Sequence, residues 1–224
     1  MKKFCLASLA VAAMLGTACN RSNNAASNGT AGTSGRVESS ASMGDRDFVQ
    51  DVTRMNAAEV DVSRLAVDKS GSPDVKKFAQ MMVDDHTAAG AKLSGVATQN
   101  GIDAPAGPDD AHRDLREKLS ARQGLDFDKD YMDAMVGDHE KLVDKLESRI
   151  DKETLSRWKG QVAQTPDGDK AKVDVKAQMV VPEKSDDPIT QRINAWAADT
   201  YPVAYAHLQA AKDLRDAVKK RSTD

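Results

Sequence analysis

The sequence predicts an all-α protein: an up-down-up-down four-helix bundle with one short extra helix, preceded by a signal peptide and a disordered linker. Three observations lead to this prediction. Four long segments repeat apolar residues every three or four positions, as amphipathic helices do. Clusters of Gly, Pro, Ser and Asn separate these segments. A chain of 224 residues that is 40% hydrophobic can form a packed core, and a bundle is the simplest way to bury four amphipathic faces.

Residues 1–18 are predicted to be a lipoprotein signal peptide. Two lysines precede an apolar run over 4–15, which is shorter than the ~20 residues that a membrane span needs. Ala18 then precedes Cys19, an arrangement similar to the lipobox of bacterial lipoproteins, in which this cysteine carries the lipid. Ordinary cleavage after Ala18 is the alternative. Lipidation is favoured because it leaves no free thiol in an oxidising compartment.

A lipid on Cys19 would place the protein in the periplasm, tethered to the membrane, with the membrane as its partner. Asn20 follows the cysteine where Asp would favour the inner membrane, so the outer membrane is expected. Residues 19–44 are rich in Asn, Ser, Gly, Thr and Ala and predict a lipid-anchored flexible linker. The bundle domain is expected over 45–224. A net charge of −3 gives no basic surface for nucleic acid, and no protein partner is indicated.

The bundle begins with two helices predicted over 45–69 and 73–99. The sequence Ser70-Gly71-Ser72-Pro73 ends the first and begins the second, with Ser72 as the expected N-cap and Pro73 in the first turn. Gly101, after an asparagine, ends the second helix because it tolerates the left-handed conformation of a C-cap.

The second half of the chain predicts a short helix over 109–122 and two further long helices. The third long helix is expected to start near Asp128 and to continue through Trp158. The last one begins at Pro188, which follows a capping aspartate. Between them, 160–187 is a polar connection with one β-like run.

Each of the four long helices carries one metal-ligand type of residue on its apolar face. These residues are Glu59, His86, His139 and His207. Counted from the helix ends at ~1.5 Å per residue, they lie at nearly the same height, so the bundle would bring them into one layer. The layer is expected to bind a metal or a small ligand, and imidazole and carboxylate groups suit one divalent transition metal such as zinc. Asp85 and Asp138 each precede one of the histidines and are expected to support the ligands from outside.

The same layer has other interpretations. A buried carboxylate can be satisfied by imidazoles alone, so that the layer only fixes the register of the helices in a structural or interaction lipoprotein. Copper ranks behind zinc: Met82 and Met135 lie four residues before histidines, but methionine most often fills cores. An oxidoreductase is the weakest class, because the Glu-x-x-His pairs of di-iron bundles are missing.

No catalytic residue and no organic-cofactor site are predicted, because the chain has no Gly-rich phosphate loop, no serine elbow and no Cys-x-x-Cys. His112 lies beside Arg113 in the short helix and is interpreted as an exposed surface residue outside the layer.

Several short motifs resemble one known family. They are Ala58-Glu59-Val60, Leu65-Ala66, Val75-Lys76-Lys77-Phe78-Ala79, Met82-Val83-x-Asp85-His86, Phe127-Asp128-x-x-Tyr131, His139, Tyr201-Pro202 and His207-Leu208. Together they are similar to the exported proteins called domain of unknown function 4142. The resemblance implies a ferritin-like four-helix fold and export, and it implies no established activity. The long 160–187 segment departs from the family's usual pattern.

Overall fold

The computed structural model describes residues 40–163 and 179–221, which form six helices. The helices are α1 (Met43–Lys69), α2 (Pro73–Gln99), α3 (Asp110–Ser120), α4 (Gly124–Glu147), α5 (Lys152–Ala163) and α6 (Pro188–Lys220). The predicted all-α fold class is confirmed for these residues. The predicted signal peptide, Cys19 and most of the linker lie outside them, as does the middle of the 160–187 connection. Within the described part of the chain, no helix is long and apolar enough to cross a membrane.

The ends of the long helices follow their capping residues. α1 begins two residues before the expected start, and the Ser42 side chain accepts a hydrogen bond from the Asp45 amide at 3.1 Å. Ser72 occupies the N-cap position of α2, but its hydroxyl does not cap the helix; it accepts a hydrogen bond from Arg221 at 3.3 Å. Gly101 takes the predicted left-handed conformation with φ 62° after α2.

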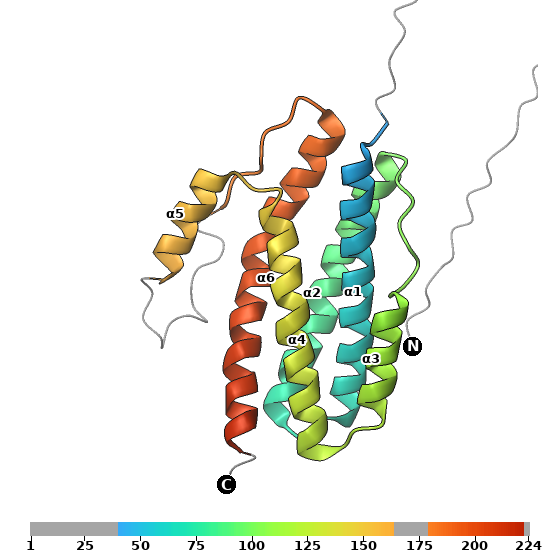
Figure 1. The fold of residues 1–224 in the computed structure, drawn as a ribbon, viewed down its shortest axis with the longest axis vertical. Helices are drawn as coiled ribbons and strands as arrows, with labels where there is room; N and C mark the ends of the chain where they lie inside the picture. The colour runs from blue at the N-terminus through green and yellow to red at the C-terminus, as the bar shows by residue number, and fades with distance from the viewer. Residues whose placement is uncertain (1–39, 164–178, 222–224) are drawn as a thin grey trace, which may run out of the picture. The chain divides into compact units, whose positions relative to one another are not determined.

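The four long helices α1, α2, α4 and α6 form a four-helix bundle, as predicted, but their directions differ from the expected up-down-up-down order. In Figure 1, α1 runs down, α2 and α4 both run up, and α6 runs down. Ion pairs and hydrogen bonds between the helices show the same order. Ser72 at the start of α2 meets Arg221 after the end of α6, and Asp133 near the start of α4 meets Lys219 in the last turn of α6. The helices α2 and α4 therefore start at the same end of the bundle.

The connection between α2 and α4 explains this order. It contains α3, which packs along α1: Arg116 pairs with Asp61 at 2.9 Å, and Lys69 donates to the Ser120 carbonyl at 2.6 Å. The chain thus returns along the bundle before α4 begins. The short helix predicted over 109–122 is present, but the predicted up-down-up-down order gave it no length of the bundle to span and so reversed α4. One long crossover is also a feature of ferritin-like bundles.

The third long helix ends earlier than predicted. α4 stops at Glu147, and the chain turns before α5 begins at Lys152. Ile150 is buried there and forms an isolated β-bridge with Pro182. Asp151 then caps α5 by accepting a hydrogen bond from the Thr154 amide at 2.9 Å. The break allows the chain to pair with the segment that leads into α6, which a continuous helix would prevent.

A buried ion pair joins α1 to the turn after α4, at the end of the bundle where α1 begins. Asp45 is 0% exposed, and Arg149 lies 2.6 Å from its carboxylate. Thr190 in the first turn of α6 donates to the same carboxylate at 2.7 Å. The Arg149 guanidinium also lies 4.6 Å from the ring centre of Phe48. These polar contacts hold this end of the bundle together. Other buried polar groups lie in the middle of the bundle.

Candidate metal site

The four residues predicted to form one layer do meet in the middle of the bundle. Glu59 comes from α1, His86 from α2, His139 from α4 and His207 from α6, and their side chains are between 0% and 5% exposed. We call these four residues the Glu/His layer. Each lies on the inward face of its helix because it takes a position in the apolar stripe that packs the core. Buried polar groups at such positions are costly unless they have partners.

The three imidazoles of the Glu/His layer form a nearly equilateral triangle. Their ring centres are separated by 5.3 Å for His86–His139, 5.5 Å for His86–His207 and 5.6 Å for His139–His207. Ligand-type nitrogens of all three lie within 4.8 Å of one another. Glu59 completes the layer, with Oε2 at 2.8 Å from His86 Nε2 and Oε1 at 3.4 Å from His139 Nδ1. Glu59 thus borders the triangle at His86 and His139, while the three imidazoles alone converge on one point.

Each imidazole is held from outside through one of its two nitrogens. His86 Nδ1 lies 2.8 Å from Asn56 Oδ1, and His139 Nδ1 lies 2.9 Å from its own helix carbonyl at Met135. His207 Nε2 lies 2.9 Å from Asp85 Oδ2. Because all three partners are oxygens, each of these nitrogens donates and the other ring nitrogen of a neutral imidazole carries a lone pair.

The remaining nitrogens have no hydrogen-bond partner among the described residues. These inward atoms are His86 Nε2, His139 Nε2 and His207 Nδ1, together with both carboxylate oxygens of Glu59. Of these atoms, Glu59 Oε2 and His86 Nε2 lie 2.8 Å apart and form a buried ion pair. Buried unpaired atoms are uncommon in native proteins, so the free nitrogens of His139 and His207 in particular require a physical reason. Imidazoles with one nitrogen bonded to a carbonyl or carboxylate and the other left free are typical of metal ligands.

The charges in the layer are coupled. Burial acts to raise the pKa of the Glu59 carboxyl, but the His139 and His86 rings outweigh burial and lower this pKa from 4.5 to about 2. Burial acts to lower the pKa of His86, whereas the Glu59 carboxylate raises it above 6.5 on balance. Burial lowers the pKa of His139. Without an added cation, the Glu59 carboxylate therefore favours the charged form of His86, whereas burial disfavours the charged form of His139.

The two aspartates expected outside the layer have different positions. Asp85 accepts the hydrogen bond from His207, and this bond lowers the pKa of the Asp85 carboxyl. Asp138 does not face the layer: its carboxylate lies 3.0 Å from Lys141 Nζ and 3.9 Å from His112 Nε2. A residue next to a layer histidine points about 100° away around the helix, so the geometry of the neighbouring helix decides what it meets.

His112 is less exposed than the sequence analysis expected. Its side chain is 16% exposed, and Nδ1 lies 2.6 Å from the Asp109 carboxylate. Asp109 is the N-cap of α3 and therefore already points toward this turn. His112 nevertheless lies outside the Glu/His layer.

The sequence did not predict two of the hydrogen-bond partners of the layer histidines, namely Asn56 for His86 and the Met135 carbonyl for His139. Asn56 is a polar residue on the apolar face of α1, three positions before Glu59, and that position was a usable signal. The Met135 carbonyl carries no sequence signal, because every residue has one. The sulfur of Met135 faces Ser63, whose hydroxyl lies 3.9 Å away, so this methionine packs in the core next to the layer. This contact weakens the copper alternative.

The fold and the site together define a four-helix bundle protein with a buried histidine cluster. The chain belongs to the family described as Domain of unknown function (DUF4142), whose model matches residues 31–167. The match includes Glu59, His86 and His139, whereas His207 in α6 lies beyond it. A search of the curated proteins and a search of the solved structures each found no match.

Proposed function

We propose that the protein binds one divalent transition metal ion of the zinc class in the Glu/His layer. The observation that carries the proposal is how the three imidazoles are bonded. One nitrogen of each lies against an outer oxygen, and of the other three, those of His139 and His207 have no hydrogen-bond partner among the described residues while that of His86 meets only Glu59. Three neutral nitrogens and one carboxylate form a ligand set that zinc accepts. The carboxylate also compensates part of the charge of a buried cation.

The number of ligands favours holding a metal over catalysis with it. Catalytic zinc sites typically have three protein ligands and keep one position for water or substrate, whereas structural sites have four protein ligands. The three histidines supply three clustered nitrogens, and Glu59, 2.8 Å from His86, is the proposed fourth ligand. No catalytic residue is therefore assigned, and the proposed activity is metal binding.

Metal titration of the full chain, purified without a polyhistidine tag or chelator, tests the proposal. A ligand that binds only the native state stabilises it by about 2.7 kcal/mol at a hundredfold excess over its Kd. Zinc should therefore raise the melting temperature of the wild type. His86→Ala, His139→Ala, His207→Ala and Glu59→Ala should each lose most of this rise. His112→Ala is the matched control and should keep it, because His112 lies outside the layer.

The second candidate is a structural lipoprotein in which the layer only fixes helix register. The 2.8 Å contact between Glu59 and His86 favours it, because this pair balances its own charge. In that case zinc, copper, iron and manganese leave the wild-type melting curve unchanged. The alanine variants then lose about 1–3 kcal/mol for each buried partner left unpaired. This combination would reject the metal proposal.

We also propose that the bundle is tethered in the periplasm, at the outer membrane, by lipid on Cys19. The support is the short apolar run over 4–15 followed by Ala18 and Cys19. Wild-type protein should fractionate with membranes, and Cys19→Ser should release it to the soluble periplasm. Equal membrane recovery of the two would contradict the tether.

A further inference from the structure

The Glu/His layer is not equally enclosed on all sides. His139 and Glu59 are 0% and 1% exposed, whereas His86 and His207 are 5% and 4% exposed. The two more accessible histidines belong to α2 and α6, which are neighbouring helices of the bundle. The layer is therefore most accessible to solvent on the side where α2 and α6 meet.

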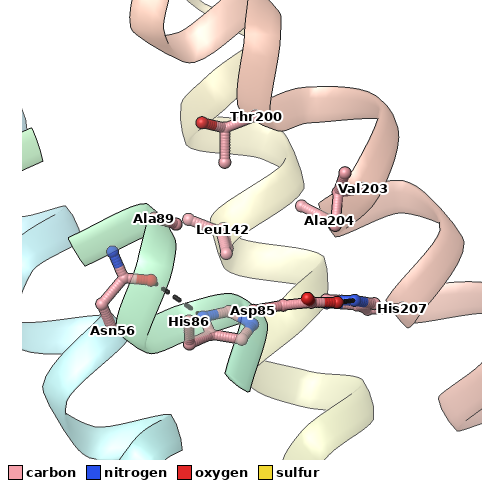
Figure 2. A pocket seen from close by; sticks show the side chains of 9 residues that line it. All are labelled: Asn56, Asp85, His86, Ala89, Leu142, Thr200, Val203, Ala204 and His207. Atoms are coloured by element: carbon pink, nitrogen blue, oxygen red, sulfur yellow. Dashed lines mark hydrogen bonds and ion pairs between the residues drawn. The ribbon is translucent and has the colours of Figure 1, made fainter. Parts of the chain in front are cut away.

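A small pocket lies at this place, and we call it the seam pocket. His86 and His207 line it together with Asp85, and Ala89 and Ala204 form part of its wall, as Figure 2 shows. Its volume of about 20 Å³ is enough for one water molecule. Neither Glu59 nor His139 lines it. The pocket thus reaches the layer at His86 of α2 and His207 of α6, and Asn56 of α1 and Leu142 of α4 complete its wall.

Asp85 is positioned at the outer side of the seam pocket. Its side chain is 47% exposed, yet its carboxylate lies 2.9 Å from the buried His207. Several other acidic residues on the bundle are neutralised by basic partners, such as Asp61 by Arg116 and Glu140 by Lys212. Within the described ranges, no lysine or arginine forms an ion pair with Asp85. Its negative charge is therefore directed at water on one side and at a layer histidine on the other.

We propose that a divalent cation enters the Glu/His layer through the seam pocket and that Asp85 captures it from solvent before His207 and His86 bind it. The inference rests on the proposed metal site. A single carboxylate at the mouth of a pocket attracts cations and raises their association rate. The hydrogen bond to His207 adds a second role, because it keeps Nδ1 of that ring free to bind the ion after entry.

The association kinetics of Co²⁺ with the metal-free full chain test this route, with visible absorbance in a stopped-flow instrument as the readout. Asp85→Asn keeps an oxygen that can accept the His207 hydrogen bond but removes the charge. It should lower the association rate about tenfold and weaken the dependence of that rate on salt. Asp84→Asn is the control: Asp84 is exposed, bonds to Gln80 and does not line the pocket, so the wild-type rate should remain.

A second variant tests the route without touching a charge. Ala89→Leu narrows the seam pocket, so it should slow association and dissociation by the same factor and leave the Kd unchanged. If Co²⁺ binds but both variants associate at the wild-type rate, the entry route is wrong and the metal site stands. An Asp85→Asn variant that only dissociates faster would also overturn the capture role, since Asp85 would then merely orient His207. Failure of the wild type to bind Co²⁺ would overturn the metal site and the route together.

Discussion

Replacing Glu59 with glutamine removes the only carboxylate of the Glu/His layer and keeps the size of the side chain. In the metal-free protein, the pKa of Glu59 is lowered to about 2 because the His139 and His86 rings outweigh burial, and the pKa of His86 is raised above 6.5 by Glu59. Between about pH 4.5 and 6.5, the native layer therefore holds a carboxylate and an imidazolium, the same charges that these groups carry in the unfolded chain. The glutamine variant has no charge to balance His86.

The stabilisation by the Glu59–His86 pair is lost on both sides of this pH range, for opposite reasons. A lowered pKa in the native state contributes stability above the unfolded value of 4.5, and this contribution is lost as the pH falls toward 2. With a native pKa of about 2, the contribution of Glu59 to the free energy of unfolding falls by about 2 kcal/mol between pH 5 and pH 3. A raised pKa, as for His86, contributes stability below 6.5 that is lost as the pH rises. The advantage of wild type over Glu59→Gln should therefore follow a bell-shaped curve, with its maximum between about pH 4.5 and 6.5.

Urea unfolding followed by circular dichroism, with chelator present and in steps from pH 3 to pH 8, measures this curve. Asp84→Asn removes an exposed carboxylate two residues before His86 and should run parallel to the wild type at every pH. The measured quantity is the difference in free energy of unfolding between wild type and Glu59→Gln at each pH. If this difference does not change with pH, or only rises or only falls, the assignment of charges in the layer is wrong.

Two further predictions concern other buried polar contacts. Asp45→Asn leaves Arg149 beside a neutral partner and should lower the free energy of unfolding by about 3 kcal/mol at pH 7. Several hydrogen bonds outweigh burial and lower the pKa of Asp45, so the loss should shrink as the pH falls below about 3.8; an equal loss at pH 7 and pH 3 in urea titrations would contradict this. Tyr131→Phe removes the 2.9 Å hydrogen bond to Ser63 and should cost about 1 kcal/mol in the same assay. Its zinc affinity, measured by calorimetry, should equal that of the wild type, and a tenfold weaker affinity would show that Tyr131 belongs to the site.

Most of the bundle could be predicted because its helices are amphipathic and are separated by turn-forming residues. The spacing of apolar residues located all four long helices, and Gly101 and Pro188 fixed two of their ends. The direction of α4 could not be predicted in the same way. It depends on where the chain after Gly101 travels, and that path is decided by contacts of α3 with α1, such as Arg116 with Asp61. Such contacts between distant segments leave no periodic pattern in the sequence.

The layer was located correctly despite this error in topology. His86 is the central residue of α2, so its distance from either end of that helix is the same. Reversing the next helix therefore leaves the predicted height of His139 nearly unchanged. The outer partners were harder to predict, because they depend on the rotation of each helix. Asp85 and Asp138 both precede a histidine, yet only Asp85 reaches a histidine of the layer on another helix, because His207 on α6 lies 2.9 Å away.

The composition of the layer also bears on the choice between a register device and a metal site. A pair of opposite charges, such as Glu59 and His86, is sufficient to fix helix register, and each residue then satisfies the other. The layer contains more than this pair. His139 and His207 each bring one further buried nitrogen without a hydrogen-bond partner among the described residues, although each has its other nitrogen bonded outside. Register alone gives no reason to bury these two nitrogens, since an apolar side chain of similar volume would avoid their desolvation cost. A cation bound by all three imidazoles and Glu59 satisfies both, and it accounts for the outer hydrogen bonds that hold the rings in place.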